Sequence, residues 1–253
     1  MRTIPKHGQE SLGAETLVRV SGMSKRYGHI SAIREVAFTI RAGEILGVIG
    51  PNGAGKTTLL ECLSGVQPAD SGEVVFASSG RKGNGRSSVL FYVPEGIAPW
   101  PHQSVRWALD FTLGFFGGRR DLYAEVERDL NLEPLLQQRV AALSKGQRKR
   151  LLLAIALLVP HPVILIDEPF EGLDLRQSRE LAETLRKHVS AGRTLVLSIH
   201  QIADAARICD RFVLLSGGEL VAEGTLEELF QAASSRLGHA PALDLEEIFL
   251  ALT

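Results

Sequence analysis

The residues best suited to chemistry in this chain form a short glycine-rich segment, which reads Gly50-Pro51-Asn52-Gly53-Ala54-Gly55-Lys56-Thr57 and is followed by Thr58. Glycines let the backbone turn tightly and point its N–H groups at phosphate oxygens, and a following helix adds the partial positive charge of its N-terminus. In such a segment Lys56 would pair with the outer phosphates, Thr57 would bind Mg²⁺ through its hydroxyl group, and Thr58 could reach an inner phosphate. The pattern therefore predicts a phosphate-binding loop.

A pair of carboxylates supplies the second candidate. The apolar residues Val163–Ile166 precede Asp167 and Glu168, so both acids are expected at the end of a buried strand, where ligands of open α/β sheets bind. We expect Asp167 to hold Mg²⁺ and Glu168 to polarise an attacking water molecule. Such a pair taken alone is as often structural as functional, and the phosphate loop is what favours the functional interpretation.

Three further features can be interpreted functionally only together with the other motifs of the chain. Leu143-Ser144-Lys145-Gly146-Gln147 is predicted to begin a helix, and composition alone would favour Ser144 as a plain N-cap. His200 follows a later predicted strand, and Tyr27 lies near the start of the chain. Taken singly, this histidine and this tyrosine would be interpreted as ordinary core or surface residues.

The order of loop, Ser-x-Gly-Gln, apolar-Asp-Glu and histidine resembles that of the nucleotide-binding subunit of an ATP-binding-cassette (ABC) transporter. The resemblance covers nearly the whole chain, from about Leu17 to Leu252. It implies that Tyr27 stacks on adenine and that Gly50–Thr58 form the Walker A loop around the phosphates of ATP. It also implies catalytic roles for Lys56, Glu168 and His200.

The same resemblance implies that ATP lies between two chains. The signature residues Ser144, Gly146 and Gln147 are expected to close over ATP held by a facing cassette, which is a second copy or a paralogous chain. Asp174 matches the D-loop, and His200 matches the residue that senses the γ-phosphate. Because a helical insertion separates Ser144 from the phosphate loop of its own chain, hydrolysis is expected to need a dimer.

The chain departs from the family pattern at two positions. Lys145 stands where a second glycine is common, and Glu95 stands where the family usually has a glutamine. Glu95 keeps an oxygen ligand for Mg²⁺, beside Thr57 and Asp167, and is expected to couple the nucleotide to the helical insertion. Both departures, and the ending Leu243–Leu250, resemble the exporter branch that moves drugs, polysaccharides, lipids or peptides.

The elements that position these residues follow from apolar periodicity. Strand patterns are present at 17–20, 36–40, 45–49, 89–93, 163–166, 194–198, 212–215 and 219–222, and helical patterns at 105–116, 122–130, 151–159 and 175–189. The predicted fold is α/β, a P-loop NTPase ABC cassette with a mostly parallel sheet core, an antiparallel β subdomain and an inserted helical subdomain.

The expected organisation is a flexible N-terminal tail at 1–15 and one ABC ATPase domain at 16–253. The helical subdomain would span about 96–160, and a short C-terminal helix 243–252. The formal net charge of −1 in 253 residues gives no general attraction to nucleic acid, and the longest apolar run, Leu151–Val159, is too short to span a membrane. We therefore expect a protein that is soluble by itself.

The resemblance also implies a partner in the membrane. An integral-membrane permease would bind the cassette and keep it in the cytoplasm at the inner face of the cell membrane. Trp100, Phe111 and Phe115 belong to an aromatic-rich region between Gly96 and Phe116, and for Trp100 core packing and a docking groove remain equally open. The alternative function is a soluble ABC ATPase that acts on nucleic acid or ribosomes.

Overall fold

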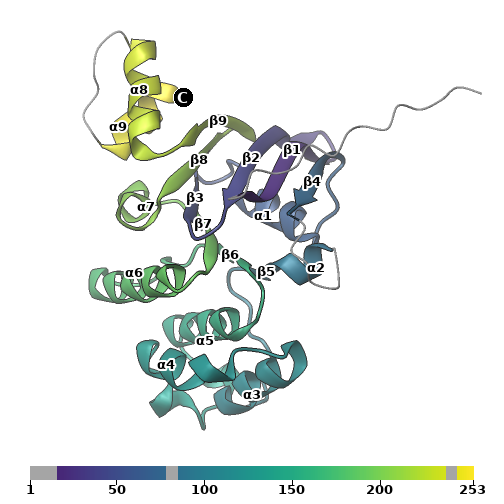
Figure 1. Cartoon of the computed structure of the whole chain (residues 1–253), viewed down its shortest axis with the longest axis vertical. Coiled ribbons are helices and arrows are strands. Elements are labelled where there is room, and N and C mark those ends of the chain that lie inside the picture. The colour runs from purple at the N-terminus through teal and green to yellow at the C-terminus, as the bar shows by residue number, and fades with distance from the viewer. Residues whose placement is uncertain (1–15, 78–84, 238–243) are drawn as a thin grey trace, which may run out of the picture.

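The computed structural model describes residues 16–77, 85–237 and 244–253, and within these ranges the strands form two sheets (Figure 1). An antiparallel sheet has the order β2 (Ile30–Arg41), β1 (Thr16–Tyr27) and β4 (Ser71–Phe76). The larger sheet has the order β5 (Leu90–Val93), β6 (Val163–Asp167), β7 (Thr194–Ile199), β3 (Ile45–Ile49), β8 (Arg211–Ser216) and β9 (Glu219–Gly224). Its strands are parallel except for β9, which forms a hairpin with β8.

Alternate residues of the larger sheet face two different layers. Leu46 and Val48 of β3 pack with the antiparallel sheet and with α1 (Lys56–Ser64), whereas Ile45 and Ile49 pack with helices of the other layer. Each central strand is thus covered on both faces, which explains why these strands are continuously apolar rather than alternating. The helices of the second layer include α6 (Leu175–Ser190) and α7 (Ile202–Ile208).

The chain between β5 and β6 is helical and lies at one end of the molecule (Figure 1). Its helices and 3-10 turns are α3 (Val105–Phe116), η1 (Arg120–Leu122), α4 (Tyr123–Asp129), η2 (Glu133–Leu135), η3 (Val140–Ala142) and α5 (Lys145–Leu158). The predicted boundaries of this subdomain, and the division into a tail and one domain, stay predictions.

A buried arginine joins the end of α5 to the start of β7. Arg193 is 7% exposed, and its guanidinium group donates to the carbonyl oxygens of Leu157 at 2.9 Å, Val159 at 2.6 Å and His161 at 2.6 Å. Carbonyl groups at a helix C-terminus have no partner within the helix, so a cation there satisfies them and interacts favourably with the helix dipole. The C-terminal end of α5 is therefore fixed to the sheet.

The predicted α/β architecture is confirmed, with some differences of detail. Val89 ends the short helix α2 (Arg86–Val89) instead of starting β5, because the Ser88 N–H and hydroxyl groups both donate to the Gly85 carbonyl oxygen and close a turn. Helix α9 (Leu245–Leu252) packs against α8 (Leu226–Leu237) and lies within 243–252, the range of the predicted C-terminal helix, whose bounds stay a prediction. The predicted tail at 1–15 and position 243 lie outside the described residues. In the described ranges no helix has the length and apolarity that a membrane crossing requires.

Candidate nucleotide-binding site

The glycine-rich segment connects β3 to α1, as the sequence predicts for a phosphate loop. Gly55 has φ +98°, and a Cβ atom there would lie 2.4 Å from the carbonyl oxygen of Ala32. Only glycine fits that position without a shift of the backbone. The loop brings Lys56 inward: its side chain is 6% exposed, and its Nζ donates to the Gly50 carbonyl oxygen at 2.9 Å.

Asp167 lies at the C-terminal end of β6 and is 4% exposed. Its carboxylate accepts hydrogen bonds from the Thr57 hydroxyl at 2.8 Å, from the Tyr92 hydroxyl at 3.4 Å and from the Ser198 hydroxyl. Burial and the nearby Asp167 carboxylate both raise the pKa of Tyr92, so this hydroxyl keeps its proton and stays a donor. The sequence prediction had not included Tyr92 or Ser198.

Glu168 follows directly and has the left-handed backbone value φ +48°. Its carboxylate lies 3.4 Å from Lys56 Nζ and 2.8 Å from His200 Nδ1. Its N–H donates to the Ser198 hydroxyl at 2.9 Å, and its carbonyl oxygen accepts from Lys149 Nζ at 2.6 Å. These bonds hold a backbone conformation that is uncommon for a residue with a side chain.

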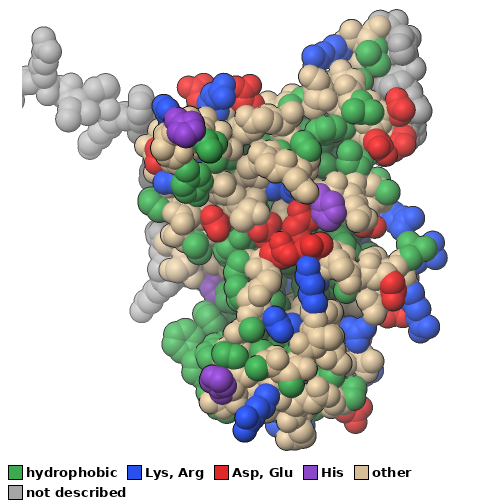
Figure 2. All heavy atoms as spheres, turned by 180° about the vertical axis from the view of Figure 1, so that it is seen from behind, with side chains coloured by type: hydrophobic (Ala, Val, Ile, Leu, Met, Phe, Trp, Pro, Cys, Tyr) green, Lys and Arg blue, Asp and Glu red, His purple; other side chains and the backbone are tan. Residues whose placement is uncertain are grey.

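Lys56, Thr57, Glu168 and His200 line one cleft of about 480 Å³. It is lined by Ile30, Ser31, Ala32, Asn52, Gly53, Gly55, Lys56, Thr57, Thr58, Glu95, Glu168, Glu171 and His200. Figure 2 shows acidic side chains gathered in a hollow of one face, with a histidine beside them. The cleft lies at the carboxyl ends of parallel strands, the usual ligand position of open α/β sheets.

Several predicted residues do not line this cleft. Gly50, Pro51 and Ala54 belong to the loop but are not among the lining residues, and Ala54 is buried behind the loop. Asp167 is also buried beside the cleft and does not line it. Tyr27 is 43% exposed at the end of β1, with Lys25 Nζ 5.5 Å from its ring centroid. The roles predicted for these residues stay predictions.

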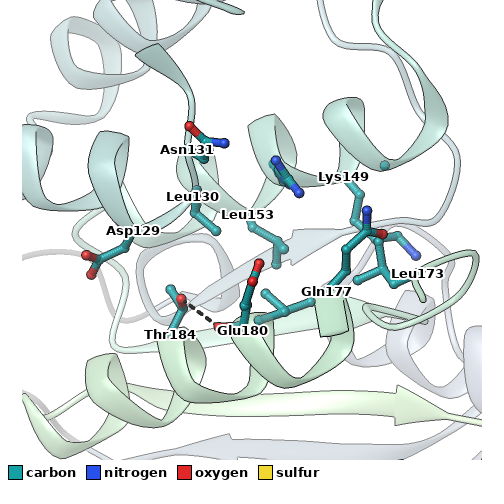
Figure 3. Close-up of a pocket in the computed structure, with 12 residues that line it drawn as sticks. Asp129, Leu130, Asn131, Lys149, Leu153, Leu173, Gln177, Glu180 and Thr184 are labelled. Carbon is teal, nitrogen blue, oxygen red and sulfur yellow. Dashed lines mark hydrogen bonds between the residues drawn. The ribbon is translucent and has the colours of Figure 1, made fainter. Parts of the chain in front are cut away.

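The residues of Ser-x-Gly-Gln lie elsewhere in the chain. Ser144 is the N-cap of α5 and forms a capping box with Gln147, in which the Gln147 N–H donates to the Ser144 hydroxyl at 3.3 Å. Gly146 lines a smaller cavity of about 70 Å³ between α4, α5 and α6 (Figure 3). Asp174 is the N-cap of α6, with its own capping box to Gln177.

The two positions that depart from the family pattern contact each other. Lys145 Nζ lies 3.6 Å from the Glu95 carboxylate and 3.0 Å from the Glu171 carboxylate. Two effects raise the pKa of Glu95: the larger is its contact with the Glu171 carboxyl group, and the smaller is partial burial. The same cluster lowers the pKa of Glu171 and raises that of Lys145.

Comparison with known proteins gives one consistent result. The ABC transporter family model matches residues 33–171. The sn-glycerol-3-phosphate import ATP-binding protein UgpC 1 of Rhizobium johnstonii is 34% identical over 227 residues, which cover 87% of this chain and 61% of that protein. The Nod factor export ATP-binding protein I of Rhizobium etli is 33% identical over 226 residues, which cover 85% of this chain and 70% of that protein.

The structure of an ATP-binding subunit of an ABC transporter superposes with a TM-score of 0.80 at 28% identity, covering 94% of this chain and 99% of that one. The ADP conformation of an ATP-binding cassette, MJ1267, has the same fold, with a TM-score of 0.73 at 21% identity over 93% of this chain and 98% of the other. The chain spans about six tenths of the length of the import relative. By its sequence, its fold and its phosphate loop, the chain belongs to the ABC transporter family as an ATP-binding cassette.

Proposed function

We propose that this chain binds and hydrolyses ATP and thereby drives a membrane transporter. The observation that carries the proposal is the convergence of Lys56, Glu168 and His200 on the cleft next to the Thr57–Asp167 pair. The loop offers backbone N–H groups and a helix N-terminus to phosphates, and the carboxyl ends of β6 and β7 supply the acid and the histidine.

Each side chain of the cleft would have a different role in ATP hydrolysis. Lys56 now bonds to the Gly50 carbonyl oxygen and faces Glu168, and phosphate oxygens would take over these contacts. Glu168 would orient and polarise the attacking water, because His200 and Lys56 hold its two carboxylate oxygens in a fixed direction. His200 would also report the γ-phosphate, since it lines the same cleft.

The donor set fits Mg²⁺. The Thr57 hydroxyl and the Asp167 carboxylate are hard oxygen ligands 2.8 Å apart, and Mg²⁺ typically takes one or two protein oxygens together with phosphates and water. Glu95 lines the cleft and could add a third oxygen. When bound, Mg²⁺ neutralises and orients the outer phosphates. Thr57 and Asp167 would hold it, and Ser198 and Tyr92 would keep the Asp167 carboxylate in place.

A second cassette completes the site in this proposal. Ser144, Gly146 and Gln147 do not line the cleft of their own chain, yet Ser144 caps the N-terminus of a helix of 14 residues, which favours an anion. Asp174 starts α6 near the same side of α5, because Leu173 and Gln177 line one cavity with Gly146. We infer that these residues close over ATP bound by a facing chain, either a second copy or a paralogue.

An integral-membrane permease is the proposed partner on the helical side. An apolar groove of about 410 Å³ is lined by Phe91, Tyr92, Val93, Ile97, Pro99, Trp100, Phe111, Phe115, Phe116, Leu152 and Ile155. Phe115 is 70% exposed at this groove, whereas Trp100 packs edge-on against Trp107 and Phe111. A short apolar helix of a permease would fit here, and it would keep the cassette at the cytoplasmic face of the membrane.

Export is the proposed direction of transport. The relatives named above include one import and one export ATP-binding protein, so the proposal rests on Glu95, Lys145 and the C-terminal helix α9, which resemble the exporter branch. Inverted membrane vesicles that carry the complete transporter would accumulate an exported substrate when ATP is added outside them. Accumulation in right-side-out vesicles with enclosed ATP would contradict this direction.

A Glu168→Gln variant tests ATP use and dimer formation together. The amide can still contact the nucleotide site but cannot accept a proton, so the variant should bind ATP with Mg²⁺, hydrolyse it very slowly and elute as a dimer in size-exclusion chromatography with light scattering. Lys56→Ala is the matched control and should stay monomeric because it loses phosphate binding. A Glu168→Gln protein that remains monomeric at saturating ATP would argue against this mechanism.

The groove is tested by two aromatic substitutions. Phe115→Ala should leave the melting temperature nearly unchanged, because its ring is 70% exposed, and should weaken co-purification with the permease. Trp100→Ala should lower the melting temperature, because its ring packs on two other aromatic rings. Undiminished permease binding by Phe115→Ala would exclude the groove as the docking surface.

A further inference from the structure

A lysine at the start of α5 forms ion pairs with two carboxylates of the cleft. Lys145 Nζ lies 3.0 Å from Glu171 Oε1 and 3.6 Å from Glu95 Oε1. Both acids line the nucleotide cleft, and Lys145 is the first residue of α5. The signature helix therefore has a direct ionic contact with the cleft of its own chain.

The side chain of Lys145 also lies against the backbone of Gly172. Gly172 has φ +74°, and a Cβ atom there would lie 3.5 Å from Lys145 Cδ, so the lysine stem crosses the chain at this glycine. One turn further along α5, Lys149 donates to the carbonyl oxygens of Glu168 at 2.6 Å and Glu171 at 2.8 Å. Two lysines on one face of α5 thus hold the segment from Glu168 to Gly172.

We propose that Lys145 is a positioning residue that ties the N-terminus of α5 to the nucleotide cleft of its own chain through Glu95 and Glu171. The inference rests on the proposed function, in which Ser144 contacts the nucleotide of the facing chain. It extends that function because Ser144 directly precedes Lys145 at the N-terminus of α5. A shift of Glu95 or Glu171 when nucleotide enters the cleft would pull on Lys145, and through it on that turn.

Lys145 also compensates negative charge beside the cleft. Glu95 and Glu171 are two acids beside a cleft that would receive negatively charged phosphates, and Lys145, with Lys149 nearby, is the cation that contacts both carboxylates directly. The side chains of Lys145, Glu95 and Glu171 are 56%, 40% and 37% exposed. Solvent screens pairs of this exposure, so the expected effect on nucleotide affinity is modest.

A double-mutant cycle measures the proposed link. The probe is a fluorescent ADP analogue with Mg²⁺, titrated into the full chain. We expect Lys145→Ala to weaken binding about three- to fivefold in the unchanged chain and less than about 1.5-fold in a Glu95→Gln, Glu171→Gln background. Lys145→Arg should restore affinity, because the guanidinium group can pair with both acids.

Lys187→Ala is the matched control. Lys187 is 49% exposed and pairs with Glu125 at 2.7 Å and Asp129 at 2.6 Å, so it has the same kind of ionic contacts away from the cleft. Its loss should leave the affinity for the ADP analogue unchanged. Melting temperatures of all variants show whether a change in affinity comes from unfolding.

Hydrogen exchange tests positioning separately from charge. Addition of Mg²⁺ and ADP should slow or speed exchange of the amides in the first turn of α5, and Lys145→Ala should abolish this response while Lys145→Arg keeps it. Equal effects of Lys145→Ala in both backgrounds, or an unaltered response of that turn, would overturn the inference. Failure of the unchanged chain to bind the ADP analogue would instead overturn the proposed function, and the inference with it.

Discussion

Replacement of Ser198 by alanine would remove the hydroxyl group that joins Asp167 to Glu168. Ser198 is completely buried, its Oγ donates to the Asp167 carboxylate, and it accepts from the Glu168 N–H at 2.9 Å. The N–H group of Glu168 is partly buried, and such a group left without a partner costs up to about 1–3 kcal/mol, while a hydrogen bond to a charged group contributes about 1.5–3 kcal/mol. The substitution should therefore destabilise the fold by about 4 kcal/mol.

The assay is thermal unfolding followed by circular dichroism, without nucleotide. For a chain of this size about 4 kcal/mol corresponds to a fall of about 8–16 °C in melting temperature. Thr112→Val is the control, since Thr112 is also completely buried and its hydroxyl donates to the Ala108 carbonyl oxygen at 2.8 Å, far from the cleft in sequence and within α3. Its melting temperature should fall much less, because the valine keeps the volume and Ala108 keeps its place in the helix.

ATP hydrolysis adds a functional measurement to the same variant. Ser198 fixes the backbone N–H of Glu168, so its loss lets the Glu168 carboxylate drift from the attacking water. Small displacements of a catalytic group cost about ten- to hundredfold in rate, and we expect a decrease of that order in kcat at saturating ATP. If Ser198→Ala melted within about 3 °C of the unchanged chain, or no lower than Thr112→Val, the reasoning from these hydrogen bonds would be refuted.

Three further outcomes are expected. Gly53 and Gly55 both have a positive φ, +80° and +98°, so alanine is strained at either position. Only at Gly55 would the added Cβ also meet the Ala32 carbonyl oxygen, at 2.4 Å, and Gly55→Ala should therefore weaken ADP binding at least tenfold more than Gly53→Ala; isothermal titration would show equal affinities if this reasoning is wrong. Burial lowers the pKa of His188, so the unfolded chain binds its proton more readily than the folded chain does; melting temperature should fall as the pH drops below about 6.5, and His188→Phe should reduce that fall. Arg193→Ala should cost about 3 kcal/mol or more in urea unfolding, because three carbonyl groups lose a charged donor, and an unchanged midpoint would contradict its capping role.

The elements with strong periodicity were predictable from the sequence. Strand β3 and helix α3 have the same bounds in the structure as in the prediction, at Ile45–Ile49 and Val105–Phe116. β3 is apolar at every position outside its glycine because it is buried on both faces, and α3 has a clear N-cap at Ser104 and a left-handed glycine at Gly117.

Short or partly polar elements were not predicted. Strand β4 begins with three exposed residues, Ser71, Gly72 and Glu73, and in the part of the chain that the structure describes it pairs only with β1, at the edge of its sheet. Helix α7 has seven residues, too few for a clear apolar face. These elements exist because neighbouring parts of the fold cover them, and such neighbours cannot be identified from local sequence.

The site divides in the same way. Lys56, Thr57 and Glu168 belong to linear motifs, and the structure brings them together in one cleft. Ser198 and Lys149 are separated from Glu168 by 30 and 19 residues, and their hydrogen bonds to it depend on the parallel pairing of β6 with β7 and on the packing of α5. For Ser198 one signal was available: it ends a predicted strand two residues before His200, and neighbouring parallel strands end at the same edge of a sheet.

Arg193 fixes the C-terminal end of α5 to the sheet, so the helix can be regarded as a lever that turns about this end. Its 14 residues form a rod about 21 Å long, with Arg193 at the C-terminal end and Ser144, beside the Lys145 ion pairs, at the other end. A rotation of about 5° about the Arg193 end would move the Ser144 end by about 2 Å. Arg193 directly precedes β7, and Ser198, which bonds to Asp167 and Glu168, lies near the other end of this strand. One strand of six residues therefore connects the nucleotide cleft to the fixed end of α5.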